Sequence, residues 1–163
     1  MDFVITTEMQ AEIGVESAAW PYEVTTTGIR AFARGVGYED PVYYDVEAAA
    51  TAGYEQLPVP PCFLGAPVYR PGYSDPVFSV PRGSGPRPRY GLTRVLDGGT
   101  ETIYERPLQA GETLSVTDRL LDLTVKQSRS LGTMLIVSRE ATYRDQAGET
   151  VARERSHYVF YES

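Results

Sequence analysis

The last third of the chain contains four segments with the composition and alternation of β-strands, and this feature constrains the fold most. The segments are rich in Val, Ile, Thr, Tyr and Leu, which favour strands over helices. They are residues 102–106, 113–123, 133–144 and 151–161, separated by turn signals at 107–111, 127–132 and 145–148. Because short turns join neighbouring antiparallel strands, we predict a four-stranded antiparallel meander.

An alanine-rich segment lies ahead of these strands. Asp45 precedes Val-Glu-Ala-Ala-Ala-Thr-Ala, and Gly53 follows, which is the pattern of an N-cap and a left-handed helix terminator. Its small side chains would let a sheet curve closely around it, although simple helix propensity explains the alanines equally well. Strands and helices in separate parts of the chain predict an α+β architecture.

Two further helices are expected nearer the N-terminus. One follows Thr6 or Thr7 and ends at Gly14, and the other follows residues 25–27 and ends at Gly35 or Gly37. Between them, Trp20-Pro21-Tyr22 predicts an irregular arm, since proline pushes its predecessor toward extended geometry.

A Pro-, Gly- and Tyr-rich stretch, residues 56–97, interrupts the chain before the strands. A segment of this length without regular structure is uncommon in a compact domain and is usually functional. Apolar residues should pack it against the body: Phe63, Leu64, Val68, Tyr69, Val77 and Phe78. Its arginines are Arg82, Arg87, Arg89 and Arg94. They could attract the phosphates of a ligand such as coenzyme A, or could simply lie on a solvated loop.

Length and net charge limit the classes of protein to which this chain can belong. A chain of 163 residues fits one domain, 1–163, and its formal net charge of −7 argues against binding to nucleic acid or to an anionic membrane. One cysteine, Cys62, and one histidine, His157, make neither a disulfide nor a usual zinc site, so no metal is expected. We expect Cys62 to be buried and His157 to be structural. No apolar run reaches the length of a signal or a membrane span, so we expect a cytoplasmic protein.

No nucleophile elbow, P-loop or dinucleotide fingerprint is present. Chemistry must therefore be sought in the stretch IRAFARGVGYEDPVYYDVEAAATAG, residues 29–53. Five of its residues occupy a recognisable frame: Phe32, Gly37, Pro41, Val42 and Ala49. The frame resembles the MaoC-like dehydratases, in which an aromatic residue precedes Gly-Asp-x-Asn-Pro, an aliphatic residue, His and, farther on, a small residue.

Three other phrases resemble the N-terminal, synthase-like branch of that family. They are PVPPCF at 58–63, the turn LDGGTE at 96–101, and ERPL at 105–108 followed by Gly111 and Glu112. The resemblance implies a single hot dog domain, in which a sheet of about five strands wraps around a central helix near residues 45–52. It also implies a dimer formed through the sheets.

In active members of the family, the Asp and His hold a water molecule and move its proton, while a backbone amide stabilises the charge that develops. Here Tyr38 stands at the Asp position, Asp40 at the Asn position and Tyr43 at the His position. A tyrosine with an ordinary pKa of about 10 is a poor base at neutral pH. We therefore assign no catalytic residue to this chain.

The resemblance then implies a non-catalytic subunit that shapes the substrate site of a (3R)-hydroxyacyl-thioester dehydratase or R-specific enoyl-CoA hydratase. A MaoC-like partner would supply the Asp and His, in a heterodimer, although a homodimer is also compatible. The ligand would be a thioester of coenzyme A or acyl carrier protein, with no other cofactor. The expected substrate-binding residues are Tyr38, Asp40, Pro41, Tyr43, Phe63 and Gly99.

Two alternatives remain open. The chain could be a divergent homodimeric hydratase or thioesterase that uses Asp40 or Asp45 as its base, or a module that binds acyl-CoA without turnover. Simpler roles exist for both carboxylates, since Asp40 precedes a proline in a turn and Asp45 stands at a helix cap.

Overall fold

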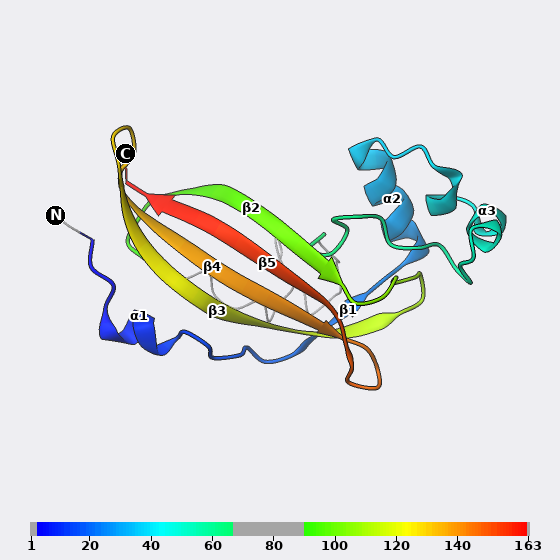
Figure 1. The fold of residues 1–163 in the computed structure, drawn as a ribbon, viewed down its shortest axis with the longest axis horizontal. Helices are drawn as coiled ribbons and strands as arrows, with labels where there is room; N and C mark the ends of the chain where they lie inside the picture. The colour runs from blue at the N-terminus through cyan, green and yellow to red at the C-terminus, as the bar shows by residue number, and fades with distance from the viewer. Residues whose placement is uncertain (1–2, 67–89, 163) are drawn as a thin grey trace.

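The structure, a computed structural model, describes residues 3–66 and 90–162. In this part of the chain, five antiparallel strands form one curved sheet in the order β1-β3-β4-β5-β2 (Figure 1). The strands are β1 Trp20–Glu23, β2 Arg94–Tyr104, β3 Thr113–Ser128, β4 Gly132–Arg144 and β5 Thr150–Tyr161. The helices lie at the two ends of this sheet, which confirms the α+β prediction.

The predicted meander is right for three strands and wrong for the fourth. Strands β3, β4 and β5 follow one another as antiparallel neighbours, but β2 pairs with β5 at the outer edge. The phrase 96–101 is also not a turn, because it lies inside β2 and forms a β-bulge between Asp97 and Gly99. The glycines permit this bulge: Gly99 has φ +115°, and a Cβ on Gly98 would lie 2.9 Å from the His157 carbonyl oxygen.

The arm around Trp20 is a strand rather than irregular chain. Strand β1 pairs with the start of β3, with Trp20 opposite Val116 and Tyr22 opposite Leu114. Pro21 is tolerated because β1 is an edge strand, where one N–H need not join a ladder. Trp20 and Tyr22 are both buried, so this short strand contributes two large aromatic side chains to the core.

The predicted helices form at the predicted N-caps, although α1 ends at Ala11, before the predicted stop at Gly14. Thr6 and Thr25 accept hydrogen bonds from the first turns of α1 (Thr7–Ala11) and α2 (Thr26–Val36), and Gly37 ends α2 with φ +80°. Helix α3 (Val46–Thr51) follows its cap Asp45. None of the helices in residues 3–66 and 90–162 has the length and apolar character that a membrane crossing requires.

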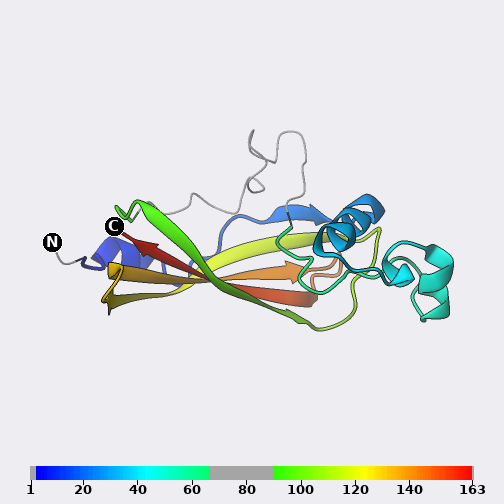
Figure 2. The same cartoon turned by 90° about the horizontal axis from the view of Figure 1, so that it is seen from above.

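The position of α3 differs from the prediction. We expected the helix near residues 45–52 to lie at the centre of the curved sheet, but α3 lies beyond the end of the sheet, next to the short 3-10 helix η1 (Pro41–Tyr43) (Figures 1 and 2). With six residues and only Ala49 buried, α3 has too little apolar surface to fill the concave face. Helix α2, which buries Ile29 and Ala33, contributes more to the core.

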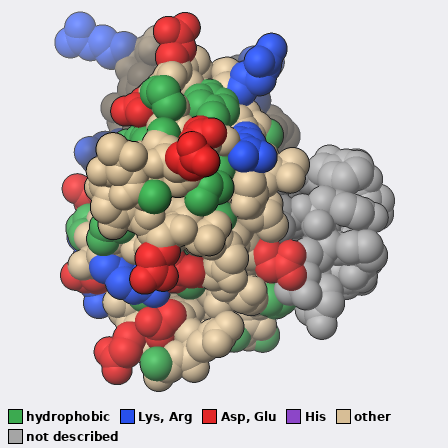
Figure 3. All heavy atoms as spheres, turned by 90° about the vertical axis from the view of Figure 1, so that its right-hand side faces the viewer, with side chains coloured by type: hydrophobic (Ala, Val, Ile, Leu, Met, Phe, Trp, Pro, Cys, Tyr) green, Lys and Arg blue, Asp and Glu red, His purple; other side chains and the backbone are tan. Residues whose placement is uncertain are grey.

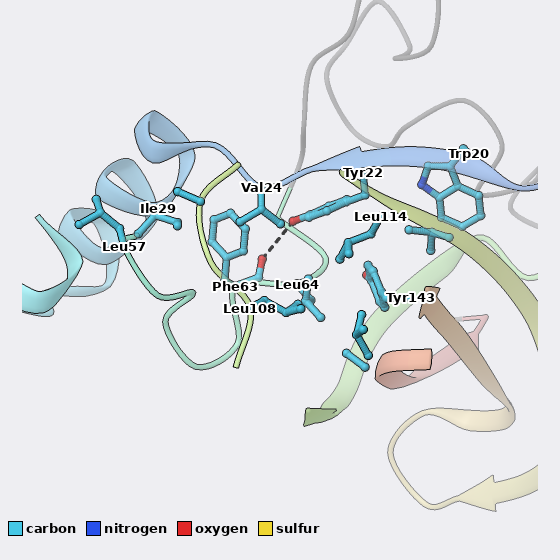
Figure 4. Close-up of a cluster of buried hydrophobic side chains, with 14 of the residues drawn as sticks. Trp20, Tyr22, Val24, Ile29, Leu57, Phe63, Leu64, Leu108, Leu114 and Tyr143 are labelled. Atoms are coloured by element: carbon cyan, nitrogen blue, oxygen red, sulfur yellow. Dashed lines mark hydrogen bonds between the residues drawn. The ribbon is translucent and has the colours of Figure 1, made fainter. Parts of the chain in front are cut away.

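The buried side chains form two clusters. The larger cluster lies between β1, the α2 end of the sheet and residues 57–64, and Figure 4 shows it in close-up. Its residues are Trp20, Tyr22, Val24, Ile29, Ala49, Leu57, Phe63, Leu64, Leu108, Ala110, Leu114, Val116, Tyr143, Val151 and Ala152. The smaller cluster, toward α1, contains Tyr90, Leu120, Leu123, Leu135 and Val137. The larger cluster holds the segment that carries the family frame against the sheet.

Candidate functional site

The loop between α2 and α3 carries four of the six residues that we expected at the site: Tyr38, Asp40, Pro41 and Tyr43. Tyr38 and Asp40 are exposed, and Tyr43 is partly buried. The Tyr38 and Tyr43 rings face each other at a centroid distance of 5.8 Å, tilted by 30°. Burial raises the pKa of Tyr43 above its ordinary value of 10.0, and the nearby Asp40, Tyr38 and Tyr54 add to the effect.

Backbone contacts fix this loop against α2. The Tyr38 N–H donates to the Ala33 carbonyl oxygen at 2.8 Å, while the Tyr44 hydroxyl donates to the Tyr38 carbonyl oxygen. The Arg30 guanidinium, one turn into α2, donates two hydrogen bonds to the Tyr44 carbonyl oxygen at 2.9 and 2.7 Å. Both ends of the loop are therefore tied to the same helix, and its geometry is pre-set.

The two candidate carboxylates serve local structure. Asp40 Oδ1 accepts from the Val42 N–H at 3.0 Å, and Asp45 Oδ1 accepts from the Ala48 N–H at 2.9 Å. These bonds make Asp40 the cap of η1 and Asp45 the cap of α3. The turn and cap interpretations of the two residues are confirmed, and each carboxylate has a structural reason to be present.

Phe63 lies beneath the loop rather than on it. Its side chain is 2% exposed and makes edge-to-face contacts with Phe32 and Tyr22, at centroid distances of 5.5 and 6.3 Å. Phe32 is the aromatic residue of the family frame and belongs to α2, so this contact packs Phe63 against that helix. Gly99 is not brought to this group, because it lies in β2 opposite His157.

Three other sequence predictions can be compared with the structure. His157 is exposed in β5, and its Nδ1 is 2.9 Å from Ser138 Oγ, a cross-strand contact compatible with a structural role. Cys62 is exposed, so its predicted burial is wrong; its φ of +61° places it in a tight turn. Of the four arginines, Arg94 is an exposed residue of β2, whereas Arg82, Arg87 and Arg89 lie outside the described residues, as do Val68, Tyr69, Val77 and Phe78.

A second polar group, which we did not predict, lies on the inner face of the sheet. Glu154 of β5 lies close enough to Tyr22, Tyr104 and Tyr143 that its charge raises the pKa of all three hydroxyls. The alternation of side chains along β5 could have revealed this group. Glu154 lies two residues from the fully buried Ala152 and therefore on the same face of the sheet. We call these four residues the inner cluster.

Residues 63–66 cover the inner cluster. The Tyr22 hydroxyl donates to the Phe63 and Ala66 carbonyl oxygens at 3.4 and 3.2 Å, a contact that is partly visible in Figure 4. Gly65 lies directly over Glu154, since a Cβ at Gly65 would be 2.9 and 3.0 Å from its two carboxylate oxygens. With φ +84° as well, position 65 requires glycine for both space and backbone geometry.

The inner cluster is electrostatically unusual. Burial raises the pKa of Glu154 above 4.5, and the charge of Asp118 raises it further. Burial also raises the pKa of Tyr104 to about 12. Within the described part of the chain, Glu154 Oε2 and the Tyr104 hydroxyl are buried without a hydrogen-bond partner. A carboxyl in this environment favours its neutral form.

The surface around the loop is mixed in character. Figure 3 looks at the α2 and α3 end of the molecule and shows acidic side chains interspersed with apolar ones. The described residues include no group of three or more His, Cys, Asp or Glu side chains placed to hold a metal ion.

Comparison with known proteins places this geometry in a family. A family model described as "FAS1-like, dehydratase domain region" matches residues 11–154. A UPF0336 protein of Streptomyces avermitilis is 34% identical over 134 residues, which cover 80% of this chain and 79% of that protein. A probable enoyl-CoA hydratase alpha subunit of Thermomonospora curvata is 31% identical over 133 residues, or 78% of this chain and 41% of that protein.

Solved structures share the fold at lower identity. The ChsH1-ChsH2 complex from Mycobacterium tuberculosis contains a chain that matches with a TM-score of 0.69 and 20% identity, covering 94% of this chain and 92% of that one. The HadBC (3R-hydroxyacyl-ACP dehydratase) complex from the same organism matches with a TM-score of 0.62 and 20% identity, covering 91% and 98%. These similarities confirm the hot dog fold class. The chain thus belongs to the FAS1-like dehydratase family.

Proposed function

We propose that this chain is a non-catalytic subunit that shapes the substrate site of a (3R)-hydroxyacyl-thioester dehydratase or R-specific enoyl-CoA hydratase. A MaoC-like partner subunit contributes the Asp and His that move the proton. One observation carries the proposal: the frame around the site is intact and well anchored, while tyrosines occupy both positions of the dyad.

The chemistry of the loop supports this role. A general base must be deprotonated near neutral pH and must reach the proton that it removes. The raised pKa of Tyr43 keeps its phenol neutral at physiological pH. Asp40 and Asp45 each accept a hydrogen bond from a backbone N–H of their own turn or helix, so both carboxylates are engaged in local structure. The loop therefore offers surface and hydrogen-bonding groups rather than a base.

The substrate contacts belong to the same proposal. Tyr38, Asp40, Pro41 and Tyr43 form one edge of the acyl site, where the two aromatic rings present an apolar wall with polar tips. Phe63 packs against Phe32 of α2, the helix to which the loop is hydrogen-bonded. The ligand is a thioester of coenzyme A or acyl carrier protein.

The names of related proteins support the same role. One relative is described as an alpha subunit, and two structural neighbours are complexes of differently named subunits. A partner subunit for this chain is consistent with both. A cytoplasmic location is part of the proposal, because a single cysteine suits a reducing compartment.

The test is an activity assay of the chain alone, of a MaoC-like protein encoded beside it, and of the two together, with crotonyl-CoA and a long-chain enoyl-CoA as probes. We expect turnover from the pair, and from the pair only when the partner's Gly-Asp-x-Asn-Pro motif keeps its Asp. In this chain, Asp40→Asn should leave turnover nearly unchanged, with Asp45→Asn as the matched capping control. Full turnover by the isolated chain, lost on Asp40→Asn, would instead establish the divergent-enzyme alternative.

A further inference from the structure

The strand pairing brings the side chains of the inner cluster together. Ala152 of β5 lies opposite Tyr104 of β2 on one side and opposite Tyr143 of β4 on the other. Glu154 is the next residue of β5 on the same face, so it is a diagonal neighbour of both tyrosines. Because the side chain of Ala152 ends at Cβ, the two phenols and the carboxyl converge over a small residue.

Two polar groups of the inner cluster have no partner. Glu154 Oε2 and the Tyr104 hydroxyl are buried and make no hydrogen bond within the described ranges. The Tyr22 hydroxyl does not satisfy the carboxyl, because it donates to the carbonyl oxygens of Phe63 and Ala66. A buried polar atom without a partner destabilises the folded state, and folded proteins keep few of them. Two in one group of four residues indicate a role other than stability.

The backbone above the carboxyl is held in place from outside the inner cluster. Two hydrogen bonds, 2.8 and 2.9 Å long, pair residues 57–59 with residues 108–110. This pairing fixes the start of the segment that continues into residues 63–66. Gly65 then crosses the carboxyl where a Cβ would lie 2.9 and 3.0 Å from its two oxygens, so no side chain separates Glu154 from the backbone above it.

The unpaired groups indicate which chemistry would satisfy them. Burial raises the pKa of Glu154, so its carboxyl favours the neutral form, which can both donate and accept. The Tyr104 hydroxyl can also do both. An uncharged hydroxyl or carbonyl oxygen can bond to the two groups at once, whereas a hydrocarbon leaves both unpaired. The nearby charge of Asp118 disfavours an anion.

We propose that the inner cluster binds an uncharged hydroxyl or carbonyl group in the acyl part of the ligand, away from the carbon atoms that react. The substrate class is then an acyl thioester that carries an oxygen function on its chain or ring. Phe63 links this position to the proposed acyl site, since its ring contacts Phe32 of α2 and its carbonyl oxygen accepts from Tyr22. The inference rests on the proposed function for the thioester ligand and adds its specificity.

The experiment is calorimetric titration of the full chain, alone and with its MaoC-like partner. The probes are ω-hydroxyacyl-CoA thioesters from hexanoyl to dodecanoyl, each compared with the unsubstituted acyl-CoA of the same length. We expect at least one hydroxylated probe to bind about tenfold or more tightly than its unsubstituted counterpart, because the latter leaves both buried groups without a partner.

Variants assign the preference to the inner cluster. Glu154→Leu removes the carboxyl and should abolish the preference for the hydroxylated probe, whereas Glu154→Gln keeps a donor and an acceptor and should retain most of it. Tyr104→Phe removes the second group and should weaken the preference. Glu149→Leu, at an exposed position in the hairpin between β4 and β5, is the matched control and should change nothing. Thermal melts verify that every variant folds.

Three results would overturn the inference. Equal binding of both probes at every length, or a preference that survives Glu154→Leu, would do so while leaving the proposed function intact. Tighter binding of an ω-aminoacyl-CoA than of the hydroxylated probe would mean that the inner cluster selects a cation. Failure of every acyl-CoA to bind would overturn the inference together with the proposed ligand.

Discussion

Two groups of tyrosines in this protein have opposite surroundings. Tyr38 and Tyr43 lie on the α2–α3 loop, one exposed and the other partly buried, at the positions where related enzymes place Asp and His. Tyr22, Tyr104 and Tyr143 lie in the inner cluster around a carboxyl. The loop carries the family frame with tyrosines at the two positions that we propose for the dyad, whereas the inner cluster has strongly perturbed groups outside that frame. Family resemblance and electrostatic perturbation therefore point to different places in one molecule.

The largest expected difference between the two groups of tyrosines is in their contribution to the free energy of unfolding. Tyr22→Ala removes a buried ring that contacts Phe63 and Tyr143, and it should lower the free energy of unfolding by about 3–5 kcal/mol. Tyr38→Ala, at an exposed position, should change it by no more than about 0.5 kcal/mol. Urea unfolding of the two variants measures the difference. Similar losses would mean that the loop is part of the core.

A smaller effect is expected at the helix cap beside the loop. Asp45→Ala removes the acceptor for the Ala48 N–H and should cost about 1 kcal/mol of unfolding free energy. Asp45→Asn keeps an acceptor oxygen and should cost less. Denaturant titration at neutral pH compares the two. Equal stability of wild type and Asp45→Ala would show that the cap contributes nothing.

The inner cluster should make the stability of the protein depend on pH. The pKa of Glu154 is raised in the folded state, so its stabilising contribution is complete below its ordinary pKa of 4.5 and is lost as pH rises through the folded value. Glu154→Gln imitates the neutral acid. It should therefore melt above wild type at pH 7, with a difference that shrinks toward pH 4.

The control for this experiment is Glu149→Gln, an exposed carboxylate with no place in the inner cluster. Its melting temperature should follow that of wild type at every pH. A Glu154→Gln curve parallel to wild type over the whole range would show that the pKa of Glu154 is not raised in the folded protein.

The smallest effect should come from the loop hydroxyls. In the proposed two-subunit enzyme, Tyr38→Phe and Tyr43→Phe keep the ring pair and should change turnover by less than about tenfold, whereas removal of a working acid or base costs roughly 100-fold or more. Steady-state kinetics with an enoyl-CoA gives the answer. A hundredfold loss in either variant would make that tyrosine a catalytic group.

Local signals in the sequence predicted local structure well. Threonine, aspartate and glycine caps marked the helices, and alternation marked β3, β4 and β5, because these depend on neighbouring residues. The place of β2 beside β5 could not be read in this way, since it depends on pairing between residues about 60 positions apart. Pro21 likewise indicated irregular chain because its edge position becomes apparent only once the sheet is known.

In the candidate site too, features set by neighbouring residues were predictable, and features set by distant strands were not. The frame from Phe32 to Ala49 was readable because it is one continuous stretch, and Asp40 and Asp45 are caps, as their sequence neighbours suggested. Glu154 was missed because its significance comes from Gly65 and three tyrosines on other strands. Only the alternation of inward- and outward-facing side chains along β5 indicated that Glu154 points inward.

Pro21 has a further consequence for how this protein can associate. The β1 edge is only four residues long and contains a residue that cannot donate to a neighbouring strand, so it is a poor template for growth of the sheet. Among the described residues, the 11-residue β2 edge has a neighbouring strand on one side only. A sheet that can be extended on one side only closes after a single addition, which favours a finite assembly over a fibre.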